Sequence, residues 1–447
     1  MNQRRATTTS RSTFSPLLWT SPTGRGLLPC PDATLGSRSN PIPKSNYITP
    51  LLRSQFPSIY ALVISQSGFL MDCELIPGLP DEIARECLIR VPFHAFPALG
   101  SVCRHWQFEL RSPLFHRLRH AAGFARSVVA LAQAEPPLAR AASGPASKYA
   151  ASGATYRLVL FDPCSGAWRR LPPIPSLPRG LPLFCQIASV GRELVVLGGW
   201  DPETWAASGG VHVYDFAIGS WREGAPMPGP RRSFFACAAS AELRTVFVAG
   251  GHDEEKNALR SAMTYDVVVD AWTHMPDMAQ ERDECRGGVF MRRGGGGVFL
   301  VLGGYPTEAQ GCFWRSLEAF DVGAWRWGAV EDGKLEARVC PRACAMGDDG
   351  HLYACQPEGD VTVAGLTQES GCAWRKVAEV PADVRMAPHL VAWEQSLIVM
   401  GSDKHGGTHA VYVAETREGT KVATPWRRVA VPDEYAGHVQ ASCCLKL

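Results

Sequence analysis

The sequence of 447 residues lacks the patterns that mark several large classes of protein. No apolar run approaches the roughly 20 residues that a helix needs to cross a bilayer. The 15 cysteines include no Cys-x-x-Cys pair and no zinc-type Cys/His spacing. There is no Gly-x-Ser-x-Gly elbow, and no Lys-Ser/Thr follows the glycines at 294–297. We therefore expect no membrane span, no metal, no cofactor and no catalytic residue.

Net charge is also scarce, and it is unevenly distributed. The formal charge of +2 gives no reason to expect nucleic acid as a partner. Residues 1–70 carry seven basic side chains and one acid (7 − 1 = +6), which leaves the remainder near 2 − 6 = −4. This Ser-, Thr-, Pro- and Arg-rich segment has no helix or strand period and is predicted to be disordered. Alternatively it is a transit peptide, or a gene-model extension upstream of Met71.

Tryptophan recurs at nearly even intervals through more than half of the chain. The intervals are 53, 51, 53, 49 and 52 residues for Trp168, Trp221, Trp272, Trp325, Trp374 and Trp426. Upstream of several of them stand an apolar strand ending in Gly-Gly, as at 194–199, and an aromatic-Asp strand end, as at Tyr214-Asp215. About four short strands per unit, with no helix between them, predict the blades of a β-propeller. The fold class is therefore mainly β.

The number of blades follows from the two ends of the repeat region, residues 127–447. The first unit supplies only three strands, and residues 437–444 resemble the opening strand of the other units. We therefore predict six blades, the first completed by a C-terminal strand that closes the ring. In the unit ending at Trp374, residues 352–356 (LYACQ) stand where Gly-Gly is expected. Because the repeat interval persists, we predict that this unit is a degenerate blade. Residues 134–147 are expected to form a long loop within the first blade.

Residues 74–120 differ in character and predict three short helices. Pro80 before Asp81-Glu82 marks the first start, Pro97 the second, and Ser112-Pro113 the third. So small a module buries little surface and tends to need a partner. The inward faces are expected to carry Ile83, Cys87, Leu88 and Val91, then Leu99, Val102, Cys103, Trp106 and Leu110, then Leu114, Phe115 and Leu118.

These residues carry two resemblances. The segments 79–83, 102–106 and 112–115 resemble an F-box, the module that docks on the Skp-type adaptor of a cullin ubiquitin ligase. The order Gly-Gly, Tyr-Asp and Trp resembles the kelch repeat, so residues 74–447 together resemble the plant kelch-repeat F-box family. The alternative is a three-helix cap packed on the propeller. The adaptor-binding residues that the resemblance implies are Leu79, Pro80, Ile83, Leu88, Val91, Leu99, Val102 and Trp106.

A closer resemblance concerns the substrate. Residues 76–80, 85–88 and 250–259 are similar to the branch whose members capture phenylalanine ammonia-lyase, the first enzyme of phenylpropanoid synthesis. Related members are linked to cytokinin response regulators. The resemblance implies a non-catalytic substrate receptor of an SCF-type ubiquitin ligase, acting in the cytoplasm or nucleus. It binds an adaptor and cullin at one module and the protein to be ubiquitinated at the other.

A propeller is expected to bind a partner with the loops between its strands, because the side chains of the strands pack against neighbouring blades. Long loops at 200–210, 252–260 and 305–315 follow the Gly pairs, and Arg-rich turns follow the Trp strands. If both sets open on one face, as in kelch propellers, they form a rim suited to carboxylate capture by Arg. Otherwise they are solvated turns and ion pairs between blades. The candidate substrate-binding residues are Arg231, Arg232, His252, Asp253, Arg282, Asp283 and Arg342.

Two further functions stay open at this point. The kelch fold also occurs in copper-radical oxidases, which need convergent Tyr, His and Cys, but the 12 histidines show no paired spacing. A non-degradative scaffold would keep the binding face of the propeller without using the adaptor.

Overall fold

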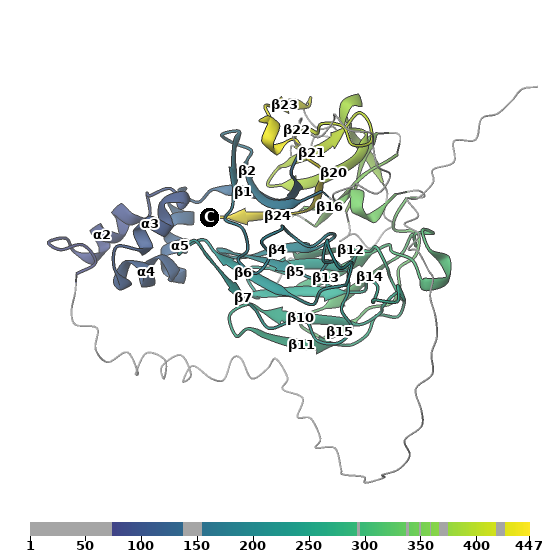
Figure 1. Cartoon of the computed structure of the whole chain (residues 1–447), viewed down its shortest axis with the longest axis horizontal. Helices are drawn as coiled ribbons and strands as arrows, with labels where there is room; N and C mark the ends of the chain where they lie inside the picture. Colours follow the sequence, from purple (N-terminus) through teal and green to yellow (C-terminus); the bar gives the residue numbers. More distant parts are fainter. Residues whose placement is uncertain are drawn as a thin grey trace, which may run out of the picture. The chain divides into compact units, whose positions relative to one another are not determined.

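The computed structural model describes residues 74–136, 154–292, 296–336, 339–347, 350–357, 359–365, 374–416 and 425–447 (Figure 1). Contacts divide the chain into two compact units, Met1–Leu79 and Pro80–Leu447. Of the first unit, residues 74–79 are described, and they form a tight turn in which Leu79 N donates to Ile76 O at 3.0 Å. Within the described ranges, no helix is both long and apolar enough to cross a bilayer. The prediction for residues 1–70 lies outside the described residues.

The second unit begins with a small helical module. Its elements are α2 (Asp81–Leu88), η2 (Phe93–Ala95), α3 (Phe96–Gly100), α4 (Arg104–Arg111) and α5 (Pro113–Ala121). The predicted cap of α5 is confirmed, because Ser112 Oγ accepts a hydrogen bond from Phe115 N at 3.0 Å. The single helix expected from Pro97 onward is wrong, since residues 101–103 separate α3 from α4. The breaks change which side chains face inward.

Two arginines, one buried and one partly buried, hold these helices together. Arg119 donates through Nη1 to the carbonyl oxygens of Ile89 and Val91 at 2.5 and 2.6 Å, and through Nη2 to Phe124 O at 2.9 Å. Burial lowers the pKa of Arg119 to about 10. Arg85 Nε lies 2.6 Å from Glu109 Oε1 and joins α2 to α4. Both arginines therefore serve the helical core.

The rest of the unit is a propeller of six four-stranded antiparallel sheets. Each sheet is one blade, with its strands numbered from first to fourth. The blades are β24 (Val439–Lys446), β1 (Ser127–Ala134), β2 (Tyr156–Asp162), β3 (Ala167–Arg170); β4 (Gln186–Val190), β5 (Glu193–Leu197), β6 (Val211–Asp215), β7 (Ser220–Glu223); β8 (Ala236–Ser240), β9 (Thr245–Ala249), β10 (Ala262–Asp266), β11 (Ala271–Met275); β12 (Arg286–Met291), β13 (Gly297–Leu302), β14 (Leu317–Asp321), β15 (Arg326–Trp327); β16 (Cys344–Met346), β17 (His351–Cys355), β18 (Asp360–Gly365), β19 (Arg375–Glu379); and β20 (Met386–Trp393), β21 (Ser396–Ser402), β22 (Ala410–Glu415), β23 (Arg427–Val429). Short 3-10 turns η3 (Thr307–Ala309), η4 (Pro341–Ala343), η5 (Ala382–Val384) and η6 (Asp433–Tyr435) lie between strands.

The first strands of the blades surround the central channel. Each of β24, β4, β8, β12, β16 and β20 contacts the first strand of the next blade, and β20 contacts β24, so the ring is closed. The C-terminal strand supplies this closure: β24 pairs with β1 from Ser127 opposite Lys446 to Gln133 opposite Val439. The prediction of six blades completed by the C-terminus is confirmed. The degenerate unit is also a complete blade, β16 to β19.

Six indoles join the blades along their outer edge. In every blade a Trp Nε1 donates to a backbone carbonyl of the preceding blade, and the six pairs are Trp168 to Ala430, Trp221 to Pro172, Trp272 to Ala225, Trp327 to Pro276, Trp374 to Lys334 and Trp426 to Glu379. The assignment of Trp325 to this set is wrong. Trp325 has a φ of 53° and lies before β15, whereas Trp327 is on the strand and makes the bond.

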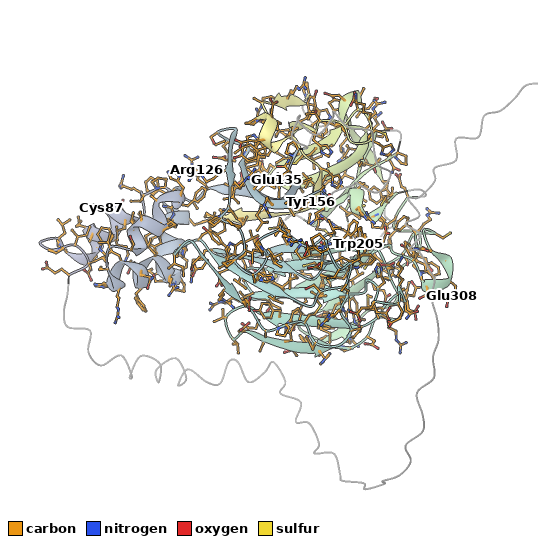
Figure 2. All side chains as sticks on the ribbon, in the orientation of Figure 1. Cys87, Arg126, Glu135, Tyr156, Trp205 and Glu308 are labelled. Atoms are coloured by element: carbon orange, nitrogen blue, oxygen red, sulfur yellow. The ribbon has the colours of Figure 1, made fainter. Side chains whose placement is uncertain are left out.

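Antiparallel strands give each blade two ends. Turns from first to second and from third to fourth strand lie at one end, where Arg192 Nη1 donates to Arg111 O of α4 at 3.1 Å. At the same end, Asp215 accepts from Arg192 at 3.0 Å and lies 3.4 Å from Arg111. We call this the helix end. The second-to-third loops and the connections between blades lie at the loop end, where Figure 2 shows Trp205 and Glu308 on the side away from Cys87 of α2.

Candidate functional site

The helical module exposes large apolar side chains. Phe108 is 68% exposed and Val102 is 61% exposed, and neither can be solvated without cost. Ile83, Leu114 and Leu118 are exposed as well. Together these five residues form what we call the helix apolar set, and they leave the module with unpartnered apolar surface of the kind that a second protein covers.

The predicted adaptor-binding residues divide between this surface and the helical core. Pro80, Ile83 and Val102 are exposed, whereas Leu79, Val91, Leu99 and Trp106 are partly buried. Leu88 is 3% exposed and packs inside the module, so it supports the helices and presents no surface to a partner. Six residues expected to face inward are exposed instead, because Ala84, Leu88 and Phe115 occupy that core: Ile83, Cys87, Val102, Cys103, Leu114 and Leu118.

At the loop end, both sets of loops meet. Backbone bridges pair Leu183 with Trp200, Ser233 with His252, and Asp283 with Tyr305. In each pair, one residue precedes the first strand of a blade and the other follows that blade's second strand. The second of each Gly pair permits this contact. A Cβ on Gly251, which has a φ of +81°, would stand 2.3 Å from Ser233 O.

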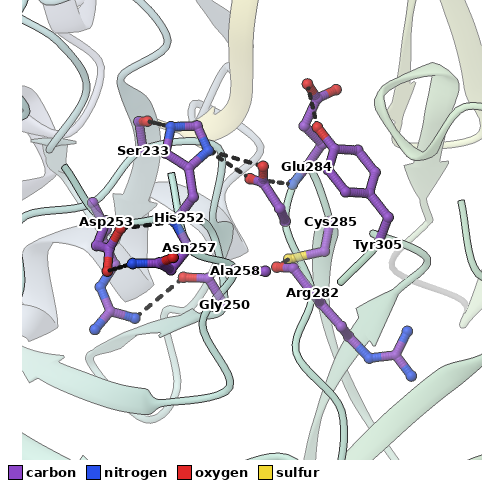
Figure 3. Close-up of polar contacts among 12 residues, drawn as sticks. Ser233, Gly250, His252, Asp253, Asn257, Ala258, Arg282, Glu284, Cys285 and Tyr305 are labelled. Carbon is purple, nitrogen blue, oxygen red and sulfur yellow. Dashed lines mark hydrogen bonds and ion pairs between the residues drawn. The ribbon is translucent and has the colours of Figure 1, made fainter. Parts of the chain in front are cut away.

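A chain of hydrogen bonds crosses these loops (Figure 3). Trp200 Nε1 donates to Ser233 Oγ at 2.6 Å, and Ser233 Oγ lies 3.0 Å from His252 Nε2. His252 Nδ1 lies 2.9 Å from both carboxylate oxygens of Asp283. Asp283 in turn accepts from Glu284 N at 2.8 Å. Three successive blades are thereby connected.

The Ser233, His252 and Asp283 side chains are arranged as in a serine hydrolase, but the arrangement lacks a usable nucleophile. Ser233 is fully buried. Its hydroxyl already accepts from the indole of Trp200. A substrate carbonyl therefore cannot reach Ser233 Oγ in this structure, and the chain of bonds fixes the loops in position. Among the described residues, no three His, Cys, Asp or Glu side chains are placed to hold a metal.

Four side chains form an entrance ring, which we define as Phe184, Phe234, Glu284 and Arg342. The Phe184 and Phe234 rings are 4.3 Å apart, and the Arg342 guanidinium lies 4.8 Å from the Phe234 ring. Arg342 also pairs with Glu284, which accepts from Tyr305 OH at 3.0 Å. Burial and the Asp283 and Glu284 carboxylates raise the pKa of Tyr305. The ring thus offers aromatic faces beside an exposed cation.

The backbone of the entrance ring is unusual. Phe184, Phe234 and Glu284 have φ values of 58°, 57° and 51°, and each stands two residues before the first strand of its blade. Left-handed backbone at a non-glycine residue costs about 1–3 kcal/mol and persists where the surroundings impose it. Its repetition in three blades shows a built feature of the loop end.

The predicted substrate-binding residues are not all at the surface. Arg232 and Arg282 are 0% exposed, so the expectation that they contact a partner is not met in this structure. Arg282 Nε pairs with Glu318 Oε1 at 3.0 Å, and Arg232 Nη1 donates to the carbonyls of Gly250 and Ser261, both at 3.2 Å. Burial lowers the pKa of Arg232 to about 10. Both side chains hold loops and strands together.

The other predicted residues lie nearer the surface or in the hydrogen-bond chain. Arg231 is exposed and its Nη1 is 3.8 Å from Glu254 Oε1. Asp253 Oδ1 accepts from Asn257 N at 2.8 Å and shapes its loop (Figure 3). His252 and Asp283 are buried and orient their neighbours. Arg342 is half-exposed and belongs to the entrance ring.

Several loop-end residues were not among those predicted from the sequence. Trp205 is 45% exposed, and its ring lies 6.2 Å from Trp200. Lys256 Nζ lies 5.9 Å from the Trp200 ring. Phe184, Phe234 and Glu284 stand at intervals of 50 and 50 residues. Aligning the repeats on the residue two before each first strand would have found the last three.

Comparison with known proteins agrees with both modules. The F-box domain family matches residues 76–118, and the Kelch motif family matches residues 183–228 and 231–279. F-box/kelch-repeat protein At1g80440 of Arabidopsis thaliana is 43% identical over 381 residues, which cover 84% of this chain and 100% of that protein. The chain belongs to the plant F-box/kelch-repeat protein family. A second member, F-box/kelch-repeat protein At1g15670 of Arabidopsis thaliana, is 41% identical over 378 residues, with the same coverage of 84% and 100%.

Membership in the F-box/kelch-repeat family assigns a task to each of the two modules. Proteins of this family are substrate-recognition adaptors and not enzymes. The F-box implies docking on a Skp-type adaptor, and the kelch propeller implies capture of a protein substrate. The helix apolar set is exposed on the F-box helices, and Arg342 of the entrance ring is exposed at the loop end.

Proposed function

We propose that this protein is the substrate-recognition subunit of an SCF-type cullin ubiquitin ligase and that its propeller captures phenylalanine ammonia-lyase. The observation that carries the proposal is the separation of the exposed helix apolar set on the F-box helices from the partly exposed entrance ring at the loop end. The substrate assignment is supported by the similarity of residues 76–80, 85–88 and 250–259 to the branch that binds this enzyme. The cytoplasm or nucleus is the expected site of action.

No residue of this chain performs covalent chemistry in the proposal. Holding the substrate near the ubiquitin-carrying enzyme raises the effective concentration of its lysines, and proximity of this kind is itself a large rate term. The entrance ring supplies flat aromatic area and a cation, both of which are frequent at the centre of protein interfaces. Trp205 and Lys256 extend this surface outward along the loops at 200–210 and 252–260.

Binding of purified full-length protein to phenylalanine ammonia-lyase tests the substrate assignment. We expect the double variant Trp205→Ala, Arg342→Ala to weaken binding at least tenfold, and Phe108→Asp on the F-box to leave it unchanged. A cytokinin response regulator serves as the competing ligand. Tight binding of that regulator together with no binding of phenylalanine ammonia-lyase would replace the substrate.

The half-life of phenylalanine ammonia-lyase in plant cells separates a degradative receptor from a scaffold. Expression of the wild-type protein is expected to shorten the half-life. Expression of Phe108→Asp, which keeps the propeller intact, is expected to have no effect. A half-life that is unchanged by the wild-type protein, although the two proteins bind, would favour the scaffold.

A further inference from the structure

The first strands of alternate blades carry a polar residue at one shared position. Gln186 of β4, Arg286 of β12 and His389 of β20 pair with Leu197, Leu302 and Met400, each of which directly precedes a glycine. In β8 the corresponding residue is Ala236, which pairs with Ala249. Since side chains alternate along a strand, residues that share a register position project in the same sense. Gln186, Arg286 and His389 therefore occupy equivalent positions on the first strands of three blades, and His389 bonds to Ser442 Oγ of β24.

Arg286 is the charged member of this set, and it has no partner. It is half-buried, and within the part of the chain that the structure describes its guanidinium makes neither a hydrogen bond nor an ion pair. Arg232 and Arg282 differ, because backbone carbonyls and Glu318 satisfy them. Gln186 is also half-buried and likewise makes no side-chain hydrogen bond to the described residues.

The surroundings of Arg286 place it among the inner strands. Its charge acts on Cys237 of β8, on Cys344 of β16 and on His389 of β20. Arg286 begins β12, and β12 contacts the first strands β8 and β16 of both neighbouring blades, so Arg286 lies on the innermost ring of strands. Because Arg286 is the first residue of β12, two residues after Glu284, it lies at the loop-end mouth of the channel.

No anion among the described residues neutralises this cation. Burial raises the pKa of Cys237 and of Cys344 to about 12, so both thiols are neutral at pH 7. Burial, with a smaller contribution from Arg286, lowers the pKa of His389 to about 3, so its ring is neutral too. The nearby acids are engaged elsewhere, Asp283 with His252 and Glu284 with Arg342. A partly desolvated charge without a partner is costly, and a bound anion would offset that cost.

We propose that the mouth of the propeller channel is an oxyanion-binding site in which the Arg286 guanidinium is the donor. A phosphate, sulfate or carboxylate group fits this donor set, because a guanidinium presents two parallel N–H groups to two oxygens. The ligand is either a dissolved oxyanion or an acidic group of a protein bound at the loop end. The site does not depend on which protein is ubiquitinated.

Titration calorimetry on the full-length protein, co-purified with its Skp-type adaptor in chloride buffer, tests the site. The probes are inorganic phosphate, sulfate and acetate. We expect the wild-type protein to bind at least one of them with one site per chain. Arg286→Met should weaken that binding at least tenfold, and Arg286→Lys should weaken it less. Arg169→Met, which removes an exposed arginine from the outer strand β3, is the matched control and should bind as the wild type does.

The three probes distinguish the sources of the ligand. Acetate binding supports capture of a carboxylate side chain, whereas binding of phosphate or sulfate alone supports a tetrahedral oxyanion. The oxyanion site is refuted if the wild-type protein binds none of the probes, or if the affinity of Arg286→Met is within twofold of that of the wild type. Arg286→Lys keeps the charge and is expected to weaken binding severalfold, so it tests the site even if Arg286→Met does not fold. Loss of binding to phenylalanine ammonia-lyase would not bear on this result.

Discussion

The indole Nε1 of Trp168 donates a hydrogen bond to the carbonyl oxygen of Ala430 at 3.2 Å, and this bond joins the first blade to the last. Trp168 also stacks on Phe161 of its own blade at 4.4 Å and on Tyr435, beyond the last blade's fourth strand, at 5.7 Å. The ring is thus closed twice, by the β24–β1 pairing near the channel and by this indole at the outer edge. Because the first blade is attached both near the channel and at the outer edge, it resists both separation from the last blade and rotation against it.

Replacing Trp168 by Phe isolates the outer closure. Phe keeps an aromatic ring between Phe161 and Tyr435 but removes the N–H donor, so we expect the free energy of unfolding to fall by about 1 kcal/mol. Thermal unfolding followed by circular dichroism measures the change. Trp325→Phe is the control, because no hydrogen bond joins the Trp325 indole to the described residues. Equal losses in the two variants would show that the bond to Ala430 contributes nothing.

Arg282→Met tests whether this arginine is structural. The variant leaves Glu318 charged and buried, both side chains being 0% exposed, and we expect a loss of about 3–5 kcal/mol in the free energy of unfolding. Arg231→Met, one loop away and exposed, should change stability little. A stable Arg282→Met protein that fails to bind substrate would restore a direct role for Arg282 in recognition.

Phe108→Asp tests the helix apolar set. Because Phe108 is 68% exposed, the aspartate should fold without penalty while placing a charge in the apolar contact with the adaptor. We expect affinity for the Skp-type adaptor to fall at least a hundredfold with no change in the unfolding temperature. Trp205→Asp is the reciprocal control, since it changes an exposed aromatic at the loop end. Adaptor binding that survives Phe108→Asp would place the contact elsewhere on the helices.

His389 predicts a specific response to acid. It lies 2.7 Å from Ser442 Oγ of β24, near Arg286, His409 and His438, and burial lowers its pKa from 6.5 to about 3. Between these values the unfolded chain binds a proton more readily than the folded chain. The contribution of His389 to the free energy of unfolding is therefore fully present above pH 6.5 and is lost progressively as the pH falls toward 3.

The contribution of His389 amounts to about 2 kcal/mol between pH 6.5 and 5, at about 1.4 kcal/mol for each pKa unit. His389→Gln should remove this part of the pH dependence, which denaturant unfolding at both pH values measures. His274→Gln, at an exposed position of β11, is the control. An unaltered slope in His389→Gln would assign the acid sensitivity to other buried groups, such as His409, whose pKa burial lowers to about 4.

The repeat made most of the propeller predictable. The blade number follows from the spacing of the repeats. The C-terminal closure follows from the strand missing in the first unit and from the similarity of residues 437–444 to the other opening strands. The error at Trp325 arose where two tryptophans stand two residues apart and the interval favoured the first. Trp325 occupies the turn position, with positive φ, that Gly166, Gly219 and Asp270 occupy in the preceding blades, and the interval alone does not distinguish this turn from the strand.

The candidate sites were less predictable because exposure is a tertiary property. Arg231 and Arg232 are neighbours in sequence, yet one is exposed and the other fully buried. The burial of Arg282 depends on Glu318, which lies 36 residues later in another strand. On the helices, the break at residues 101–103 rotates the apolar positions that one continuous helix would have aligned. The two buried arginines depend on partners distant in sequence, whereas the helix break is a local feature that the apolar pattern did not reveal.

The helix end and the loop end are separated by the height of a blade. A second strand such as β5 has five residues, which at about 3.3 Å each give roughly 16 Å. The blade therefore acts as a rigid spacer between the adaptor contact and whatever is held at the other end. Lysines of the bound substrate that contact the loop end are shielded by the propeller. Substrate lysines that extend sideways beyond the edge of the propeller remain accessible to ubiquitination. We expect the choice among acceptor lysines to follow from this geometry more than from the sequence around each lysine.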